Sequence, residues 1–170
     1  MMDIKLEKLQ HADANKLYEF ELENKAYFEK MVPSRGDDYY HLEIFIKNHE
    51  ALLDEQAKGR SCFYLIKDEN DILLGRMNLV DIYKSQHMGH IGYRVGEAYT
   101  GKGVAHTALK LFLSMVSKQG IKQILAKTTT NNIASQRVLE KNGFTCMETD
   151  DKAFEMNGQL FKFVYYKWNM

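Results

Sequence analysis

The spacing of hydrophobic and polar residues changes period several times in the first third of the chain. Residues 4–9 alternate between apolar and polar side chains, which predicts a half-buried strand. Residues 11–31 carry apolar side chains at helical spacing, and the proline-containing stretch 32–36 interrupts them. A second helix is predicted over residues 37–58, because an aspartate at position 37 or 38 can cap it.

The middle of the chain is a run of strand signals. Residues 62–68 and 72–83 flank a short polar turn, and residues 87–95 form a third apolar run. Three successive strands without an intervening helix predict an antiparallel meander.

The last part of the chain alternates between helix and strand. Residues 104–118 place seven apolar side chains on one helical face, so a strong amphipathic helix is predicted there. Residues 121–129 read as a strand, and residues 132–141 as a short helix that ends at an Asn-Gly pair. Two further strands are predicted at residues 144–149 and 160–169.

The order of these elements, β-α-α-β-β-β-α-β-α-β-β, defines the expected fold class. It predicts an α+β fold (mixed α/β), in which a mixed, mostly antiparallel sheet of about seven strands is flanked by four helices on both faces. A chain of 170 residues suits one domain with its own core. No linker or internal repeat is visible, so we expect a single domain over residues 1–170.

Composition and charge exclude several classes of protein. The 23 basic and 23 acidic side chains balance, so the net charge attracts neither nucleic acid nor an anionic membrane, and we expect neither as a partner. No run is apolar enough to span a bilayer, and the N-terminus lacks the apolar core of a signal peptide. We therefore expect a cytoplasmic protein.

The cysteines and histidines do not predict a metal site. Cys62 and Cys146 lie far apart without metal-like spacing, so we interpret them as reduced structural thiols. His87 and His90 form the closest histidine pair. On a strand, residues three apart point to opposite faces, which makes them poor co-ligands.

A glycine-rich stretch before the third predicted helix, GEAYTGKGVAHTAL, begins as a nucleotide-binding P-loop begins. A P-loop needs Ser or Thr after the Gly-Lys pair, to hold Mg²⁺, but Gly103 stands there. It also needs an acidic residue at the end of a later strand, and strand 121–129 ends in Lys-Thr-Thr. The stretch is therefore not the P-loop of a nucleotide hydrolase.

The same stretch retains the physical properties of an anion cradle. Gly101 and Gly103 allow close approach of a ligand to the backbone and permit positive φ. The helix that follows begins with unpaired N–H groups and a positive dipole end, and Lys102 adds a charge. The alternative is a plain glycine turn that only introduces a helix.

Three motifs together resemble a known family. They are IGYRV at residues 91–95, GKGVA at residues 101–105, and N-x-x-S-x-x-V-L-E-K-N-G-F at residues 132–144. In this combination and order they resemble the GNAT superfamily of acetyl-CoA-dependent N-acetyltransferases, and within it the RimJ/RimL type that acetylates protein N-termini. The resemblance covers Ser61 to the C-terminus well, and the first third by its order of elements.

The resemblance implies where acetyl-CoA, the acetyl donor, would bind. The sheet is expected to splay open after its fourth strand and to hold acetyl-CoA in the gap. The residues expected to pair through their backbone with the pantetheine arm are Tyr93, Arg94 and Val95. Those expected to wrap the pyrophosphate are Gly101, Lys102, Gly103, Val104 and Ala105. Family members usually carry Gln or Arg three residues before the first glycine, and Ala98 departs from this pattern.

Acetyl transfer to an amine makes three chemical demands. The amine must lose a proton, the carbonyl oxygen must be stabilised as it becomes negative, and the leaving thiolate needs a proton. A thioester is already activated, so direct attack in a ternary complex needs neither Cys62 nor Cys146 as a nucleophile. We expect a backbone N–H within residues 93–95 to stabilise the oxyanion. By resemblance Ser135 is the acid that meets the CoA sulfur, or else it only hydrogen-bonds its own helix; Asn132 holds the cofactor, caps the helix, or both.

The general base is open to several interpretations. Many relatives carry Glu two residues before the Gly-Tyr pair of the fourth strand, where this chain has His90. A histidine titrates near neutral pH and can take the proton directly or through water, or it can be a strand residue without a task. Glu97, Glu148 and Glu155 are the alternatives.

The acceptor is expected to be a primary amine, most simply the N-terminal amine of a protein, as in the ribosomal-protein type. The alternatives are a small-molecule amine, namely a polyamine, amino acid or aminoglycoside, and a non-catalytic acyl-CoA-binding module. Acidic residues of the first helices, Glu21 among them, can attract a cationic amine or form a solvated face. The resemblance also allows a homodimer.

Overall fold

The computed structural model describes residues 3–170, and a seven-stranded sheet runs through them in the order β1-β2-β3-β4-β5-β9-β6. Its strands are β1 (Ile4–Lys8), β2 (Cys62–Asp68), β3 (Leu73–Tyr83), β4 (Met88–Val95), β5 (Gln123–Thr129), β6 (Thr145–Thr149) and β9 (Phe163–Asn169). Neighbouring strands are antiparallel, except that β4 and β5 are parallel. A separate hairpin is formed by β7 (Phe154–Met156) and β8 (Gln159–Phe161).

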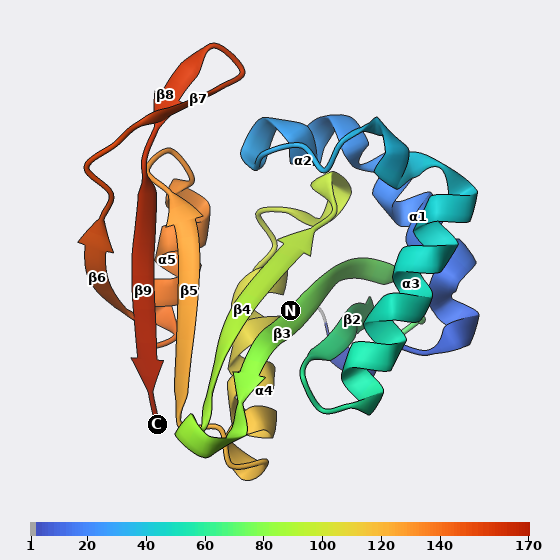
Figure 1. Cartoon of the computed structure of the whole chain (residues 1–170), viewed down its shortest axis with the longest axis horizontal. Helices are drawn as coiled ribbons and strands as arrows, with labels where there is room; N and C mark the ends of the chain where they lie inside the picture. The colour runs from blue at the N-terminus through green and yellow to red at the C-terminus, as the bar shows by residue number, and fades with distance from the viewer. Residues whose placement is uncertain (1–2) are drawn as a thin grey trace.

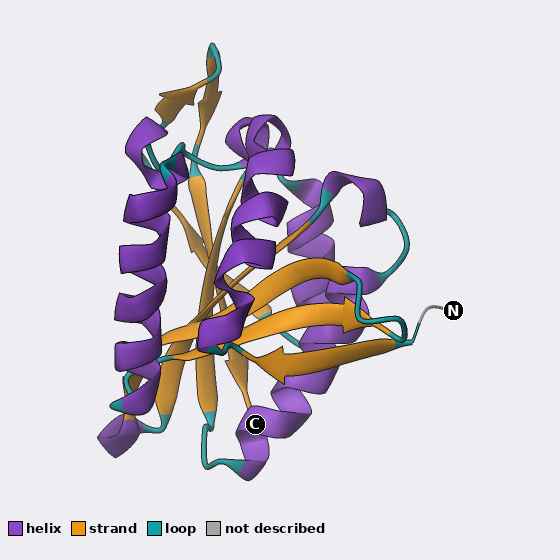
Figure 2. Ribbon diagram, turned by 90° about the vertical axis from the view of Figure 1, so that its right-hand side faces the viewer, coloured by secondary structure: helices purple, strands orange, loops and turns teal. Residues whose placement is uncertain are grey.

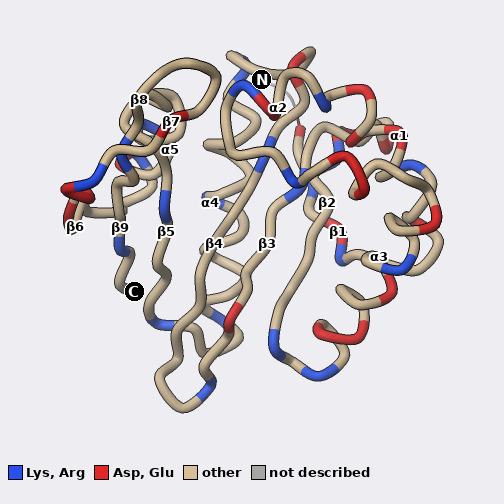
Figure 3. The backbone as a smooth tube through the Cα atoms, turned by 45° about the horizontal axis from the view of Figure 1, so that its top comes forward, with Lys and Arg blue, Asp and Glu red and all other residues tan. Residues whose placement is uncertain are grey.

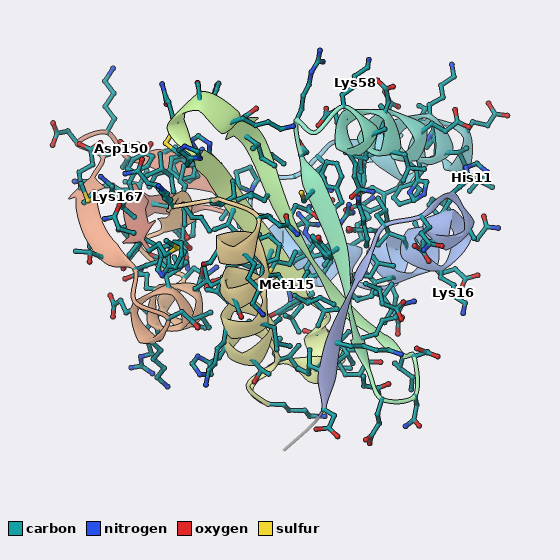
Figure 4. The ribbon with its side chains drawn as sticks, turned by 90° about the horizontal axis from the view of Figure 1, so that it is seen from below. His11, Lys16, Lys58, Met115, Asp150 and Lys167 are labelled. Atoms are coloured by element: carbon teal, nitrogen blue, oxygen red, sulfur yellow. The ribbon has the colours of Figure 1, made fainter. Side chains whose placement is uncertain are left out.

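Within the described part of the chain, five α-helices cover the two faces of the sheet (Figures 1 and 2). They are α1 (Ala14–Glu23), α2 (Lys25–Met31), α3 (Leu42–Ala57), α4 (Val104–Lys118) and α5 (Ile133–Lys141). The first three lie on one face and the last two on the other. Seen from below, Met115 of α4 points toward the sheet, while Lys16 of α1 and Lys58 after α3 point outward (Figure 4).

Each face of the sheet has its own hydrophobic core, and β2 contributes to both. Its Tyr64 and Ile66 pack with Phe112 of α4, whereas the alternating Phe63 and Leu65 pack under α1 and α3. A strand that is buried on both faces reads as a continuous apolar run, as CFYLI does. The predicted fold class, a mixed and mostly antiparallel sheet with helices on both faces, is confirmed.

The prediction of one helix over residues 11–31 is wrong, because Asn24 divides it. The chain leaves helical geometry there, with φ −100° and ψ 6°. The buried side chain of Asn24 donates from Nδ2 to the carbonyl of Phe20 at 2.9 Å and accepts at Oδ1 from the amide of Glu97 at 2.9 Å. An asparagine that bonds the backbone competes with the helix ladder. Here it also ties α1 to the loop after β4.

Three other predicted boundaries are also wrong. The second helix does not begin at residue 37, because residues 37–40 form a single 3₁₀ turn and α3 starts at Leu42. The predicted helix 132–141 begins one residue later, since Asn132 is its cap. The predicted strand 160–169 is divided between β8 and β9, and its first part pairs across the Asn157-Gly158 turn with β7, a strand that was not predicted.

The parallel contact between β4 and β5 is short. It comprises four residue pairs, from Met88 with Gln123 to Ile91 with Ala126. Beyond them β4 continues to Val95 against β3, and β5 continues against β9. The two strands therefore diverge toward their carboxyl ends, and the expected splay after the fourth strand is present (Figure 1). Within residues 3–170 no helix has the length and apolar character needed to cross a bilayer.

Candidate active site

Two connected pockets fill the opening between β4 and β5. The first, of about 380 Å³, lies toward the segment that follows α2 and is lined by polar side chains that include Arg76, Asn78 and Lys127. The second, of about 160 Å³, lies toward α4 and α5, with Ala105 and Val138 in its wall. Both pockets are lined by Met31, Val32, Tyr93, Arg94, Asn132 and Ser135. The predicted residues Tyr93, Arg94, Asn132 and Ser135 are thus brought together where the pockets meet.

The glycine loop presents open main-chain donors at the start of α4. Gly101 and Gly103 have φ of +74° and +78°, and a Cβ on either would meet no atom within 4 Å. Among the described residues, none accepts a hydrogen bond of normal geometry from the amides of residues 101–105, whereas the flanking amides of Thr100 and Thr107 are bonded. A run of free amides at the N-terminus of a 15-residue helix favours an anion.

The side chains of this loop contribute unequally. Val104 is buried in the core with 2% exposure, so only its backbone faces the solvent side of the loop. Lys102 is exposed, and Ala105 lines the second pocket. The cradle is therefore built mainly from backbone, which is why the departure at Ala98 leaves its donors intact.

The edge of β4 that faces the opening is unpaired from Gly92 to Val95. No strand in residues 3–170 pairs with it there, because β5 has already turned away. Unpaired main-chain groups beside a pocket are available to an extended ligand. This places Tyr93, Arg94 and Val95 where a strand-like arm can lie.

Ser135 and Tyr93 form a hydroxyl pair at the junction of the pockets. The Oη of Tyr93 lies 3.3 Å from the Oγ of Ser135. Burial raises the pKa of Tyr93 to about 12, although the hydrogen bond to Ser135 opposes this shift. The phenol is therefore protonated at neutral pH and can hold a proton next to Ser135.

Asn132 caps α5 and leaves the hydroxyl of Ser135 free. Its Oδ1 accepts from the amide of Ser135 at 3.2 Å. The helix start is thereby satisfied by Asn132, and the Oγ of Ser135 bonds across to Tyr93 instead of to its own helix. Ser135 thus lines both pockets with its hydroxyl next to that of Tyr93, and its role as the acid stays a prediction.

Two arginines that line the first pocket form a buried ion-pair cluster with a glutamate of α1. Glu21 of α1 has no exposed surface and accepts from Arg76 at 2.9 Å and from Arg94 at 3.1 Å. The Arg94 guanidinium also lies 4.5 Å from the centre of the Phe28 ring. Burial alone would raise the pKa of Glu21, but the neighbouring arginines outweigh it and hold the pKa below 4.5. Glu21 therefore forms neither a solvated face nor a free anionic site.

The predicted bases lie outside both pockets. His90 pairs with Leu125 below the point where the strands separate, and it lines a third pocket, of about 790 Å³, together with Glu148. That pocket adjoins the first one through shared walls at β4 and β5. Glu97 and Glu155 are exposed and line none of these three pockets. Residues 3–170 contain no group of three or more side chains placed to hold a metal ion.

Two features of the site are not among those that the sequence predicts. The hydroxyl of Tyr93 is one, because the motif around it indicates a role for its backbone alone. The arginine cluster had a readable signal, since Arg76 and Asn78 stand at alternate positions of an otherwise apolar strand, LLGRMNLV. Polar residues on one face of such a strand indicate groups that are buried and paired or that face a site.

Comparison with known proteins agrees with this geometry. Residues 3–145 match the family described as acetyltransferase (GNAT) domain. Probable N-acetyltransferase YjcK of Bacillus subtilis (strain 168) is 29% identical over 153 residues, which are 88% of this chain and 84% of that protein. Ribosomal protein uS5-alanine N-acetyltransferase of Escherichia coli (strain K12) is 25% identical over 136 residues, which are 78% of this chain and 70% of that protein.

A solved structure shows the same fold. RimL, the ribosomal L7/L12 α-N-protein acetyltransferase in complex with coenzyme A, has a TM-score of 0.89, with coverage of 100% of this chain and 96% of that one. The sequence identity is 21%, so this likeness concerns the fold. The family match, the splayed sheet and the motifs at the opening agree: the chain belongs to the GNAT acetyltransferase family.

Proposed function

We propose that this protein transfers the acetyl group of acetyl-CoA to an α-amino group, most simply the N-terminal amine of a peptide or protein. The observation that carries the proposal is the meeting of two pockets at Tyr93 and Ser135. The second pocket reaches Thr100 and Ala105 at the anion cradle, and the first, which we assign to the acceptor, is lined by Arg35 after α2 and by Phe163 of β9. In Figure 1 α2 and the β7–β8 hairpin lie on either side of the same end of the opening.

The residues around the second pocket suit coenzyme A. The free amides of residues 101–105 suit a pyrophosphate, and the absence of a Cβ at Gly101 and Gly103 leaves room for it. The wall formed by Tyr27, Val95 and Val138 suits the pantetheine arm. Bound acetyl-CoA would supply a thioester-activated acetyl group.

The chain's own hydroxyls would manage the proton of the leaving sulfur. Ser135 Oγ holds a proton at the junction, and Tyr93 Oη, at 3.3 Å, can replace that proton because its phenol is neutral at working pH. A backbone amide of the unpaired edge of β4 would stabilise the oxyanion. Direct attack needs no covalent enzyme intermediate. Burial raises the pKa of the Cys62 thiol, which disfavours a thiolate nucleophile.

The charge of the first pocket favours an α-amine over a polyamine. Four cationic side chains, Arg35, Arg76, Arg94 and Lys127, line it, and no carboxylate does so among the described residues. An α-amino group has a pKa of about 7.7–8.0, whereas an alkyl amine of the lysine type has about 10.4. Near pH 8 about half of the first is already neutral, and nearby cations lower its pKa further. The proton would pass to water, with His90 in the adjoining pocket as the predicted base for that water.

Release of CoA thiol tests the proposal. The purified protein, given acetyl-CoA and a short peptide with a free N-terminus, should release thiol at least about tenfold faster than with spermidine at pH 8. The same peptide with a blocked N-terminus is the matched control and should release none above background. If thiol is released with spermidine but not with the peptide, the acceptor is a polyamine and the proposal of an α-amine is wrong. Binding of acetyl-CoA without release from any amine would identify a non-catalytic module.

A further inference from the structure

We infer that the acceptor carries a carboxylate close to the amine that is acetylated, and that the first pocket binds this carboxylate. The inference rests on the proposed function, because it concerns the acceptor of the same reaction. The chemistry is that of an acidic residue next to the N-terminus of a peptide, or of the carboxyl group of a free amino acid.

The first observation is an excess of cations without partners. Of the four that line the pocket, Arg76 and Arg94 already share Glu21. Arg35 and Lys127 form no ion pair within residues 3–170. Arg35 instead donates to the hydroxyl of Tyr39 at 2.7 Å, and the Nζ of Lys127 lies 4.3 Å from the centre of the Phe163 ring.

These two cations approach the pocket from opposite sides of the opening. Arg35 belongs to the segment after α2, and Lys127 belongs to β5. Figure 3 shows Lys and Arg segments on β3, β4 and β5 beside the opening, whereas Asp and Glu segments gather over α1 and α3. A concave site lined by one sign of charge concentrates ligands of the opposite sign.

The second observation is a pair of buried polar atoms without partners. Arg76 is only 4% exposed, yet its Nε has no hydrogen-bond partner among the described residues. The buried Oδ1 of Asn78, two positions along the same strand, also has none. Both residues line the first pocket, and both also line a fourth pocket, of about 360 Å³, on the side of α3. Buried polar atoms are nearly always satisfied, so a free donor and a free acceptor on the same face of β3 suit a ligand that supplies both partners.

The two free atoms match the two halves of the inferred acceptor. The Nε of Arg76 is a donor and suits a carboxylate oxygen, which guanidinium groups bind well. The Oδ1 of Asn78 is an acceptor and suits the N–H groups of an amine. An amine with a nearby carboxylate therefore satisfies both atoms, whereas a polyamine would leave the Nε of Arg76 unpaired. The carboxylate also compensates the positive charge of the pocket, which a polyamine would increase.

A matched set of peptides tests the inference. The acceptors are Ser-Asp-Ala-Ala-amide, its isosteric Asn counterpart and its Lys counterpart, and the measured quantity is kcat/KM for release of CoA thiol. We expect the Asp peptide to exceed the Asn peptide by about tenfold at low salt, and the advantage to shrink as salt is raised. Alanine compared with alaninamide tells whether a free amino acid supplies the carboxylate instead.

Two exposed cations provide variants that should fold. Arg35→Gln and Lys127→Gln should each bring the Asp-to-Asn ratio closer to one. The matched controls Arg60→Gln and Lys122→Gln, which change exposed cations outside the described pockets, should leave the ratio unchanged. Calorimetry with N-acetyl-Ser-Asp-Ala-Ala-amide gives a readout without turnover, and its affinity should fall in the same two variants.

The outcomes separate the inference from the proposed function. If thiol is released but the Asp peptide and alanine show no advantage over their neutral counterparts, the inference is overturned and the transferase stands. If the ratio is high but survives both substitutions, the carboxylate is not bound by this pocket, and the inference is overturned as well. If no amine releases thiol, the proposed function itself fails.

Discussion

At Ser135, the main chain and the side chain have different partners. The amide donates to Asn132, and the Oγ contacts the hydroxyl of Tyr93 across the pocket. Serines inside helices commonly bond back to their own helix, as Ser117 does by donating to the carbonyl of Leu113 at 2.6 Å. The two serines are thus chemically alike and differently placed.

This contrast defines the prediction at the residue scale. Ser135→Ala should release CoA thiol about 10²- to 10⁴-fold more slowly, because the sulfur loses its proton donor. Its affinity for acetyl-CoA, measured by calorimetry, should stay within about threefold, since the cradle is remote from the hydroxyl. Ser117→Ala is the control and should keep full turnover. A Ser135→Ala protein with unchanged turnover would remove Ser135 as the acid.

At the scale of single elements, helix α4 has a glycine in left-handed geometry at each end. Gly103 precedes it with φ +78°, and Gly120 follows it with φ +92°. Neither would bring a Cβ within 4 Å of another atom, so a substitution at either position strains the backbone without a clash. Only the N-terminal end presents free amides to an anion.

The two glycines therefore form a matched experiment on the cradle. Gly103→Val and Gly120→Val should each lower the free energy of unfolding by about 1–3 kcal/mol, measured by urea denaturation. Only Gly103→Val should also weaken binding of coenzyme A, by at least about tenfold, because it disturbs the donors themselves. Equal affinities in the two variants would place the pyrophosphate elsewhere.

At the scale of the whole molecule, Glu21 ties α1 to two strands that are distant in sequence. It lies 55 positions from Arg76 and 73 positions from Arg94. Removing one partner of a buried ion pair leaves unpaired buried charge, which costs about 3–5 kcal/mol. The cluster therefore links α1 to the wall of the first pocket. Whether Glu21 is ionised should affect the free energy of unfolding of the whole domain.

The pH dependence of stability follows from this cluster. The pKa of Glu21 is lower in the folded protein than its ordinary 4.5, so its contribution is present above about pH 4.5 and is lost as pH falls through the folded value. Glu21→Gln should be destabilised by about 3–5 kcal/mol at pH 7, and the gap to the parent protein should narrow as the pH falls toward 3. Urea denaturation at both pH values measures the gap, and a constant gap would contradict the assignment.

Whether a feature could be predicted from the sequence depends on how far apart in the sequence its contacting residues lie. The glycine loop, the cap at Asn132 and the apolar run of β2 are local signals, and the sequence alone indicates them. The Tyr93–Ser135 pair spans 42 positions, and the cluster of Glu21 with Arg76 spans 55. Such contacts exist only once the sheet has formed: a local pattern can mark Arg76 as a polar residue of an apolar strand, but it does not encode the partner. The break at Asn24 belongs to the same class, because its second partner is Glu97.

The four-pair seam between β4 and β5 has a mechanical consequence. Within residues 3–170 it is the only ladder joining the first four strands to the last three strands of the large sheet. An extended ligand that pairs with the free edge of β4 would act as an additional strand beside this contact. The two parts of the sheet, β1 to β4 and β5 with β9 and β6, would then move less relative to each other. When the ligand is bound, the backbone amides of β4 and of β5 beside the opening should therefore both exchange their hydrogens more slowly.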